Sequence, residues 1–177
     1  MSTYIAFLRA INLGAKRKFP KDAIRRACEQ AGFTDVETYL NTGNVRVSTS
    51  LTSRSEVEAA LEAAFEEEAG FEVPVIAFTP DELTEIAREA DEHARGHEGM
   101  HYVSLLKETP SPETIQLMEE AGKDDEVARV GGRAVHLLLG PDYHTARLNN
   151  AVVEKMLGVA TNRNVRVIRT LAEKWGS

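Results

Sequence analysis

The chain contains the stretch Tyr39-Leu40-Asn41-Thr42-Gly43-Asn44-Val45, in which a strand is expected to fold straight back through a polar turn. Apolar strand patterns lie on both sides of the turn, at residues 36–40 and 45–48. We expect Gly43 to adopt a positive φ, either in a type II turn or in a type I turn with a bulge. The stretch therefore predicts a β-hairpin.

The segments around this hairpin complete a recognisable order of elements. A buried strand is predicted at residues 3–10, a helix from Pro20 to residue 31, and a second helix at 53–69 opened by the capping box Ser53-x-x-Glu56. A further strand follows at 73–78, where Pro74 suggests the edge of a sheet. The order β-α-β-β-α-β is that of the split βαβ, or ferredoxin-like, fold.

The remaining residues approximately repeat this order. Strands are predicted at 100–107, 126–130 and 133–139, the last two joined by the hairpin signal Gly131-Gly132. Helices are predicted at 80–91, 112–121 and 146–157, and Thr161 is expected to cap a last helix whose inward face is Val165, Ile168, Ala172 and Trp175. We therefore expect an α+β protein of two ferredoxin-like subdomains packed together, residues 1–79 and 80–177.

Composition places the chain among globular proteins of a reducing compartment. Of its 177 residues, 42% are hydrophobic and 28% charged, which is typical of a folded domain. The single cysteine, Cys28, excludes an internal disulfide framework and fits the apolar face of the first helix as a core residue. No apolar run is long enough for a secretory signal or a membrane span. We expect a cytoplasmic protein with no membrane partner.

The formal net charge of −7 conceals a segregation along the chain. Residues 1–50 carry eight basic and four acidic side chains, residues 51–128 five and 21, and residues 129–177 eight and three. The acidic middle favours solubility by coating helices, whereas the two basic ends can attract an anion.

The predicted topology gathers polar residues at one edge of the first sheet. The first and second strands of a split βαβ unit run parallel, so the loop after the first and the turn after the second lie at the same end. A helix start there adds N–H groups and partial positive charge. The alternative is a plain loop and hairpin with solvated lysines. The predicted ligand-binding residues are Arg9, Asn12, Gly14, Lys16, Asn41, Thr42, Gly43 and Asn44.

A second basic set lies near the C-terminus, where Thr161-Asn162-Arg163-Asn164 is expected to begin a helix that also carries Arg166 and Arg169. Such a helix start can bind an anion, or it can be a cap followed by a solvated face. We include Arg163 and Asn164 in the predicted site.

The histidines do not predict a metal centre. His93, His97 and His101 have helical spacing, but Gly96 and Gly99 interrupt any helix, and His136 lies in an apolar strand as a packed residue. His144 lies in a loop where an acid–base role lacks a nucleophile. No nucleotide-binding or hydrolase motif is present. We expect no metal and no cofactor.

Four segments carry a resemblance to a known family. Arg9-Ala10-Ile11-Asn12-Leu13-Gly14, Tyr39–Asn44, Glu154-Lys155 and Thr161-Asn162-Arg163-Asn164 resemble the bacterial domain-of-unknown-function family 1697. The likeness runs in order over nearly the whole chain, and it implies a pair of ferredoxin-like α/β subdomains without implying a reaction. Ala15, Thr42 and Val165 depart from the residues common in such proteins. Val165 removes a possible stacking surface.

These observations favour a protein that binds a small anionic or phosphorylated ligand at the edge formed by residues 9–18 and 41–44. An enzyme acting on a phosphate or carboxylate substrate, with Arg9 and Arg163 as charge stabilisers, is an alternative that lacks an evident general base. An interaction module is a third. A pI near 5.3 and 6% aromatic residues disfavour nucleic acid as partner. The sequence carries no signal for the oligomeric state.

Overall fold

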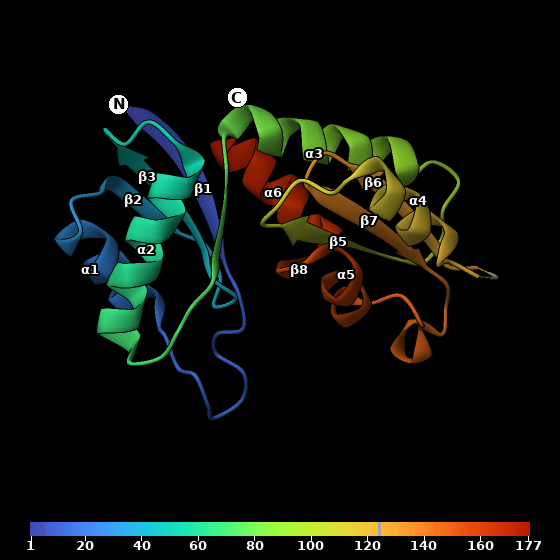
Figure 1. Cartoon of the computed structure of the whole chain (residues 1–177), viewed down its shortest axis with the longest axis horizontal. Coiled ribbons are helices and arrows are strands. Elements are labelled where there is room, and N and C mark those ends of the chain that lie inside the picture. The colour runs from blue at the N-terminus through green and yellow to red at the C-terminus, as the bar shows by residue number, and fades with distance from the viewer. Residues whose placement is uncertain (124) are drawn as a thin grey trace. The chain divides into compact units, whose positions relative to one another are not determined.

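A computed structural model describes residues 1–123 and 125–177 and divides the chain into two compact units, Met1–Pro80 and Asp81–Ser177 (Figure 1). Each unit contains one four-stranded sheet with helices, so the predicted α+β class with two ferredoxin-like units is confirmed. None of the helices within the described residues has the length and apolar character needed to cross a membrane.

The first unit contains four strands and two helices, which are β1 (Ser2–Leu8), α1 (Lys21–Gln30), β2 (Thr34–Thr38), β3 (Asn44–Thr49), α2 (Arg54–Ala69) and β4 (Val75–Phe78). Its sheet has the order β2-β3-β1-β4, and every neighbouring pair is antiparallel. β3 therefore lies between β1 and β2, as the split βαβ pattern predicts. β4 is an edge strand, in agreement with the prediction from Pro74.

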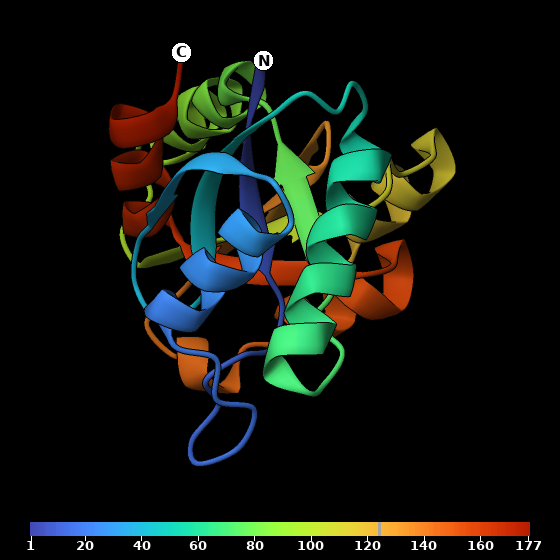
Figure 2. The ribbon, with the colours of Figure 1, turned by 90° about the vertical axis from the view of Figure 1, so that its left-hand side faces the viewer.

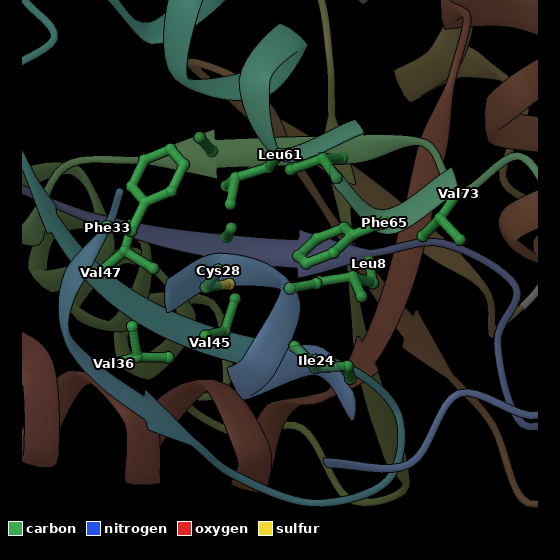
Figure 3. Close-up of a cluster of buried hydrophobic side chains, with 14 of the residues drawn as sticks. Leu8, Ile24, Cys28, Phe33, Val36, Val45, Val47, Leu61, Phe65 and Val73 are labelled. Atoms are coloured by element: carbon green, nitrogen blue, oxygen red, sulfur yellow. The ribbon is translucent and has the colours of Figure 1, made fainter. Parts of the chain in front are cut away.

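Helices α1 and α2 lie side by side on one face of this sheet (Figure 2). Alternate residues of a strand point to opposite faces, and in β1 it is Tyr4, Ala6 and Leu8 that face the helices. Figure 3 shows Leu8, Cys28 and Phe65 within the resulting core. Burial raises the pKa of the Cys28 thiol to about 12, so this residue is an inert core side chain, as predicted.

The second unit repeats the arrangement with additional helices. Its elements are α3 (Pro80–His93), β5 (Met100–Leu106), α4 (Pro112–Glu120), β6 (Val127–Gly131), β7 (Ala134–Leu139), the short 3₁₀ helix η1 (Tyr143–Thr145), α5 (Asn150–Leu157), β8 (Ala160–Asn164) and α6 (Val165–Trp175). The sheet order is β6-β7-β5-β8, again antiparallel throughout. The predicted hairpin at Gly131-Gly132 joins β6 to β7.

Three predictions for the end of this unit are wrong. Residues 160–164 form the strand β8, so Thr161 does not cap a helix, and Asn164 is the cap of α6. The preceding helix begins at Asn150 rather than at residue 146. On α6, Leu171 rather than Ala172 is among the fully buried residues. β8 was missed because its sequence is polar, and the strand exists through its pairing with β5.

The sheet of the second unit is covered on both faces. On one face, Leu106, Leu137 and Leu139 pack in a core that includes residues of α4 and α5. The opposite face carries His101 of β5 and His136 of β7. The ring of His136 lies against that of His93 on α3, with the ring centroids 5.0 Å apart. Two histidines therefore lie on the inner surface of a covered sheet, where apolar side chains are more usual.

Gly43 has the backbone conformation expected from the sequence, with φ of +89°. The structure adds a second requirement, because a Cβ atom at this position would lie 2.7 Å from Leu8 Cβ and 2.9 Å from Ile11 Cδ1. A side chain here is therefore opposed both by the backbone conformation and by packing against β1 and the loop after it.

We expect Gly43→Ala to lower the free energy of unfolding by roughly 2–4 kcal/mol, the combined cost of a positive φ and of overpacking. Gly14→Ala is the matched control, because Gly14 also has a positive φ, +61°, but its Cβ would meet no atom within 4 Å. The control should lose about 1 kcal/mol. Urea denaturation measures both values, and equal losses would show that packing against Leu8 and Ile11 is unimportant.

Candidate functional site

The loop after β1 and the turn before β3 lie together, joined by the side-chain amide of Asn12. Its Nδ2 donates hydrogen bonds to the carbonyl oxygens of Phe19, at 3.0 Å, and Asn41, at 2.6 Å. Its Oδ1 accepts from the Phe19 N–H at 2.7 Å. The expected neighbourhood of loop, turn and helix start is therefore present. Asn12 holds it together, because its amide bonds the backbone of Phe19, two residues before α1, and of Asn41 in the turn.

Asn44 has a comparable role within the turn. Its side chain is 1% exposed, and Nδ2 donates to the carbonyl oxygen of Tyr39 at 2.7 Å and to Thr42 Oγ1 at 3.1 Å. Together with the packed backbone of Gly43, these contacts shape the turn itself. Three of the predicted site residues thus have an evident structural task.

The other predicted residues of the first unit lie nearer the surface. Gly14, Lys16 and Asn41 are exposed, and Arg9 is half-buried at the end of β1, where its N–H donates to the carbonyl of Pro74. The neighbouring Arg17 is engaged with the protein, since its guanidinium lies 4.5 Å from the ring centroid of Phe71. Anion binding by this exposed strip stays a prediction.

Arg163 and Asn164 belong to the second unit, at the end of β8. Arg163 is 5% exposed, and its Nη1 donates to Thr161 Oγ1 at 2.8 Å and to the Asn162 carbonyl at 2.9 Å. Burial lowers the pKa of Arg163 to about 10, which leaves the guanidinium charged at neutral pH. Asn164 caps α6, because its Oδ1 accepts from the Arg166 N–H at 2.9 Å. Arg163 supports the strand, and Asn164 begins the helix.

A cavity of about 420 Å³ lies in the second unit at this helix start. Its walls come from the loop after α3, the first two residues of β5 and the first turns of α6. The side chains that supply charge or hydrogen-bonding groups to the lining are those of His97, His101, Asn164, Arg166 and Arg169. The register of β5 and β8, which pairs Tyr102 with Asn164, brings His101 beside the start of α6. Sequence-distant groups therefore meet here through strand pairing.

The cavity is basic in character. The aligned peptide units of α6 place partial positive charge at its N-terminus. Arg166 is exposed, and the Nε of Arg169 donates to Asp91 Oδ1 at 2.8 Å in a surface ion pair. His97 Nε2 lies 3.2 Å from the carbonyl oxygen of Met100, which acts as the acceptor for that nitrogen. The carboxylate of Asp91 offsets part of the positive charge of Arg169. Arg166 keeps its full positive charge.

His101 connects the lining of the cavity with buried side chains of the second unit. Its Nε2 lies 3.2 Å from Nδ1 of His136, and Nε2 of His136 lies 3.7 Å from Oε2 of Glu89 on α3. The second distance is longer than a hydrogen bond, so Glu89 acts on His136 only as a nearby carboxylate. Within the described part of the chain, His101 Nδ1 and His136 Nε2 are buried atoms without a hydrogen-bond partner.

Both histidines are neutral near neutral pH. Burial lowers the pKa of His101 to about 4, with a further contribution from the charge of Arg169. Burial likewise lowers the pKa of His136 to about 3, aided by His101 and His93. Burial raises the pKa of Glu89, and the neighbouring Glu85 adds to the effect. A neutral imidazole next to two arginines offers one donor and one acceptor nitrogen instead of a third positive charge.

In the sequence, His97 and His101 stand out only for their helical spacing with His93, which Gly96 and Gly99 interrupt, so no metal site is predicted there. Among the residues that the structure describes, no group of three or more His, Cys, Asp or Glu side chains could hold a metal ion. His101 faces the sheet surface covered by α3 and α6, and only the three-dimensional pairing of β5 with β7 and β8 reveals its neighbours. No local pattern indicates this contact.

The two buried histidines make stability depend on pH. In the unfolded chain they titrate near 6.5, whereas in the folded protein their pKa values are about 4 and about 3. Between these values the unfolded state binds more protons, so stability is lost as pH falls below 6.5. We expect the free energy of unfolding to fall by up to about 1.4 kcal/mol per pH unit for each histidine.

Urea denaturation at pH values between 7 and 4.5 measures this slope. This range lies largely between the unfolded and folded pKa values of the two histidines. His136→Phe should flatten it, because one of the two groups is removed. His144→Phe is the control, since His144 is exposed in η1 of the same unit and should leave the slope unchanged. A His136→Phe slope equal to that of the unaltered protein would contradict the assignment of buried neutral imidazoles.

Comparison with known proteins supports the fold and assigns no reaction. A solved structure, that of the conserved bacterial protein SP0830 from Streptococcus pneumoniae, is similar over 99% of this chain and 98% of that chain, with a TM-score of 0.76 and 19% sequence identity. A search of curated proteins finds no match. The family described as proteins of unknown function, DUF1697, matches residues 1–136. Because this match covers well over half of the sequence, the chain belongs to the DUF1697 family.

Proposed function

We propose that the protein binds a small oxyanion, of the phosphate or carboxylate class, in the cavity of the second unit. The observation that carries the proposal is the convergence of Arg166, Arg169 and the start of α6 on one cavity that His101 also lines. Guanidinium groups and helix N-termini are the groups that proteins commonly use for phosphate and carboxylate. The volume of about 420 Å³ is in the range of small-ligand sites.

The local charge supports an anion over a cation or an apolar ligand. Residues 129–177 carry eight basic and three acidic side chains, although the whole chain is acidic. Asp91 contacts Arg169 through Nε, and five N–H groups are available on a guanidinium, so this ion pair leaves donors for a ligand. The pI near 5.3 and the small cavity favour a compact anion over a long polyanion such as nucleic acid.

A second candidate is the exposed strip of the first unit, which contains Gly14, Lys16, Asn41 and Thr42. The observation in its favour is that Asn12 holds loop and turn together with their polar backbone at one edge. The cavity is the stronger candidate because it is concave and is lined by two arginines. In the first unit, the side-chain amides of Asn12 and Asn44 are already hydrogen-bonded to the backbone of the loop and turn.

Isothermal titration with inorganic phosphate tests the choice between these sites. We expect Arg166→Ala to weaken phosphate binding about 10- to 100-fold, which corresponds to the loss of one charge-assisted hydrogen bond of about 1.5–3 kcal/mol. Arg169→Ala should have an effect of the same sign. Lys16→Ala is the control, because it removes a positive charge that is also exposed, but from the first unit.

The outcome is unambiguous in either direction. If Lys16→Ala abolishes binding and Arg166→Ala does not, the ligand binds to the first unit and the cavity proposal is wrong. If neither phosphate nor a simple carboxylate such as acetate or citrate binds the unaltered protein, or raises its Tm, anion binding as a whole is refuted.

A further inference from the structure

A second cavity, of about 270 Å³, lies in the second unit and shares no lining residue with the cavity at the start of α6. It lies on the sheet face that packs against α4 and α5, and α5 runs beside β8 (Figure 1). Its lining includes Leu137 and Leu139 of β7 and Leu148, each at most 4% exposed. One wall of this cavity is therefore apolar and belongs to the core of the unit.

Three side chains with rings complete much of the lining. Tyr102 of β5 is paired with Leu137 of β7, so both side chains lie on the same face of the sheet. Tyr143 and His144 come from η1, and their ring centroids lie 3.9 Å apart. Among the described residues that line this cavity, none is Asp, Glu, Lys or Arg. Such a lining favours an uncharged ligand with flat apolar faces.

The polar part of the lining is held by a chain of hydrogen bonds that ends on a backbone carbonyl. Nδ2 of Asn150 donates to the carbonyl oxygen of Ala160 at 3.0 Å, and Oδ1 of the same amide accepts from Ser104 Oγ at 2.9 Å. Because the hydroxyl has one proton, Ser104 Oγ is the acceptor for Nδ2 of Asn162, at 3.3 Å. Within the described residues this is the one hydrogen bond of the Asn162 side chain, whose amide keeps donor and acceptor capacity for a ligand.

We propose that this second cavity binds an uncharged, flat heterocyclic ring of the size of one nucleobase, stacked on tyrosine rings and hydrogen-bonded at its edge by Asn162. The volume lies just below the range of sites for drug-sized ligands, which limits the ligand to one ring or two fused rings. Such rings combine faces that stack on aromatic side chains with an edge that an Asn amide recognises. The inference does not depend on the proposed function, because the two cavities have different linings.

The lining opposes other classes of ligand. An aliphatic chain would match the leucines, but it would remove water from the Asn162 amide and from the hydroxyl groups of Tyr102 and Tyr143 without replacing its hydrogen bonds. A charged ligand would meet no Asp, Glu, Lys or Arg in the described lining. The net charge of −7 further opposes a long polyanion such as nucleic acid. A flat, uncharged heterocycle matches both the apolar and the polar parts of this cavity.

Titration of the unaltered protein with uracil and with adenine, followed by ¹H–¹⁵N amide spectra in a buffer without phosphate, tests this inference. We expect the shifting amides to be those of Tyr102, residues 137–150 and Asn162. Dihydrouracil is the matched control ligand, because it has the hydrogen-bonding edge of uracil on a puckered, non-aromatic ring. It should bind about five- to 100-fold more weakly than uracil, which is the contribution expected of stacking on an aromatic side chain.

Two substitutions separate stacking from recognition of the edge. Tyr143→Leu keeps an apolar side chain and removes the ring, so it should weaken uracil binding and leave dihydrouracil binding nearly unchanged. Tyr39→Leu makes the same change at a half-buried tyrosine of the first unit and should alter neither. Asn162→Leu should weaken uracil binding about two- to tenfold, the loss of one net hydrogen bond. Unchanged amide shifts in the first unit show that each variant of the second unit is folded.

The outcomes distinguish this inference from the proposed function. If neither uracil nor adenine shifts any amide at millimolar concentration, or if the shifts gather outside the second cavity, the inference is overturned. Equal binding of uracil and dihydrouracil by the unaltered protein would overturn it as well, whether or not the variants fold. Phosphate binding is measured separately with Arg166→Ala, so a failure of one proposal leaves the other standing.

Discussion

The antiparallel register of β5 and β8 is the constraint on which the candidate site depends. Because Tyr102 pairs with Asn164, β8 ends and α6 begins beside His101 at the start of β5. A shift of one residue would move His101 to the other face of the sheet and separate it from Arg166 and Arg169. The same register leaves β8 at the edge of the sheet, and Arg163 supports it there with hydrogen bonds to Thr161 and Asn162.

The two units share one strand order but place their polar residues at different junctions. In the first unit, the side chains of Asn12 and Asn44 satisfy backbone groups, and Gly43 allows the turn to pack against β1. In the second unit, the junction of strand and helix opens into a cavity with two arginines and a buried histidine. Burial keeps His101 and His136 uncharged near neutral pH. The stability of the folded protein therefore falls in acid, and a neutral imidazole lies next to the cationic arginines.

Local signals predicted the features that depend on local chemistry. The positive φ of Gly43, the Ser53 cap, the Gly131-Gly132 hairpin and the edge position of the strand after Pro74 each follow from one or two residues. β8 was missed because Ala160-Thr161-Asn162-Arg163-Asn164 has no apolar alternation and is defined by its partner strand. Arg166 and Arg169 were visible as a basic helix start, but the contact of His101 with that start, and with His136, arises from pairing between distant strands.

The central claim is that the second unit carries the anion site. The most direct measurement is a series of ¹H–¹⁵N amide spectra of the unaltered protein during titration with phosphate. These spectra report on backbone amides in both units, and no substitution is needed. We expect the amides that shift to belong to residues 94–101 and 164–169. Shifts gathered instead at residues 9–18 and 41–44, or an unchanged spectrum at saturating phosphate, would contradict the account.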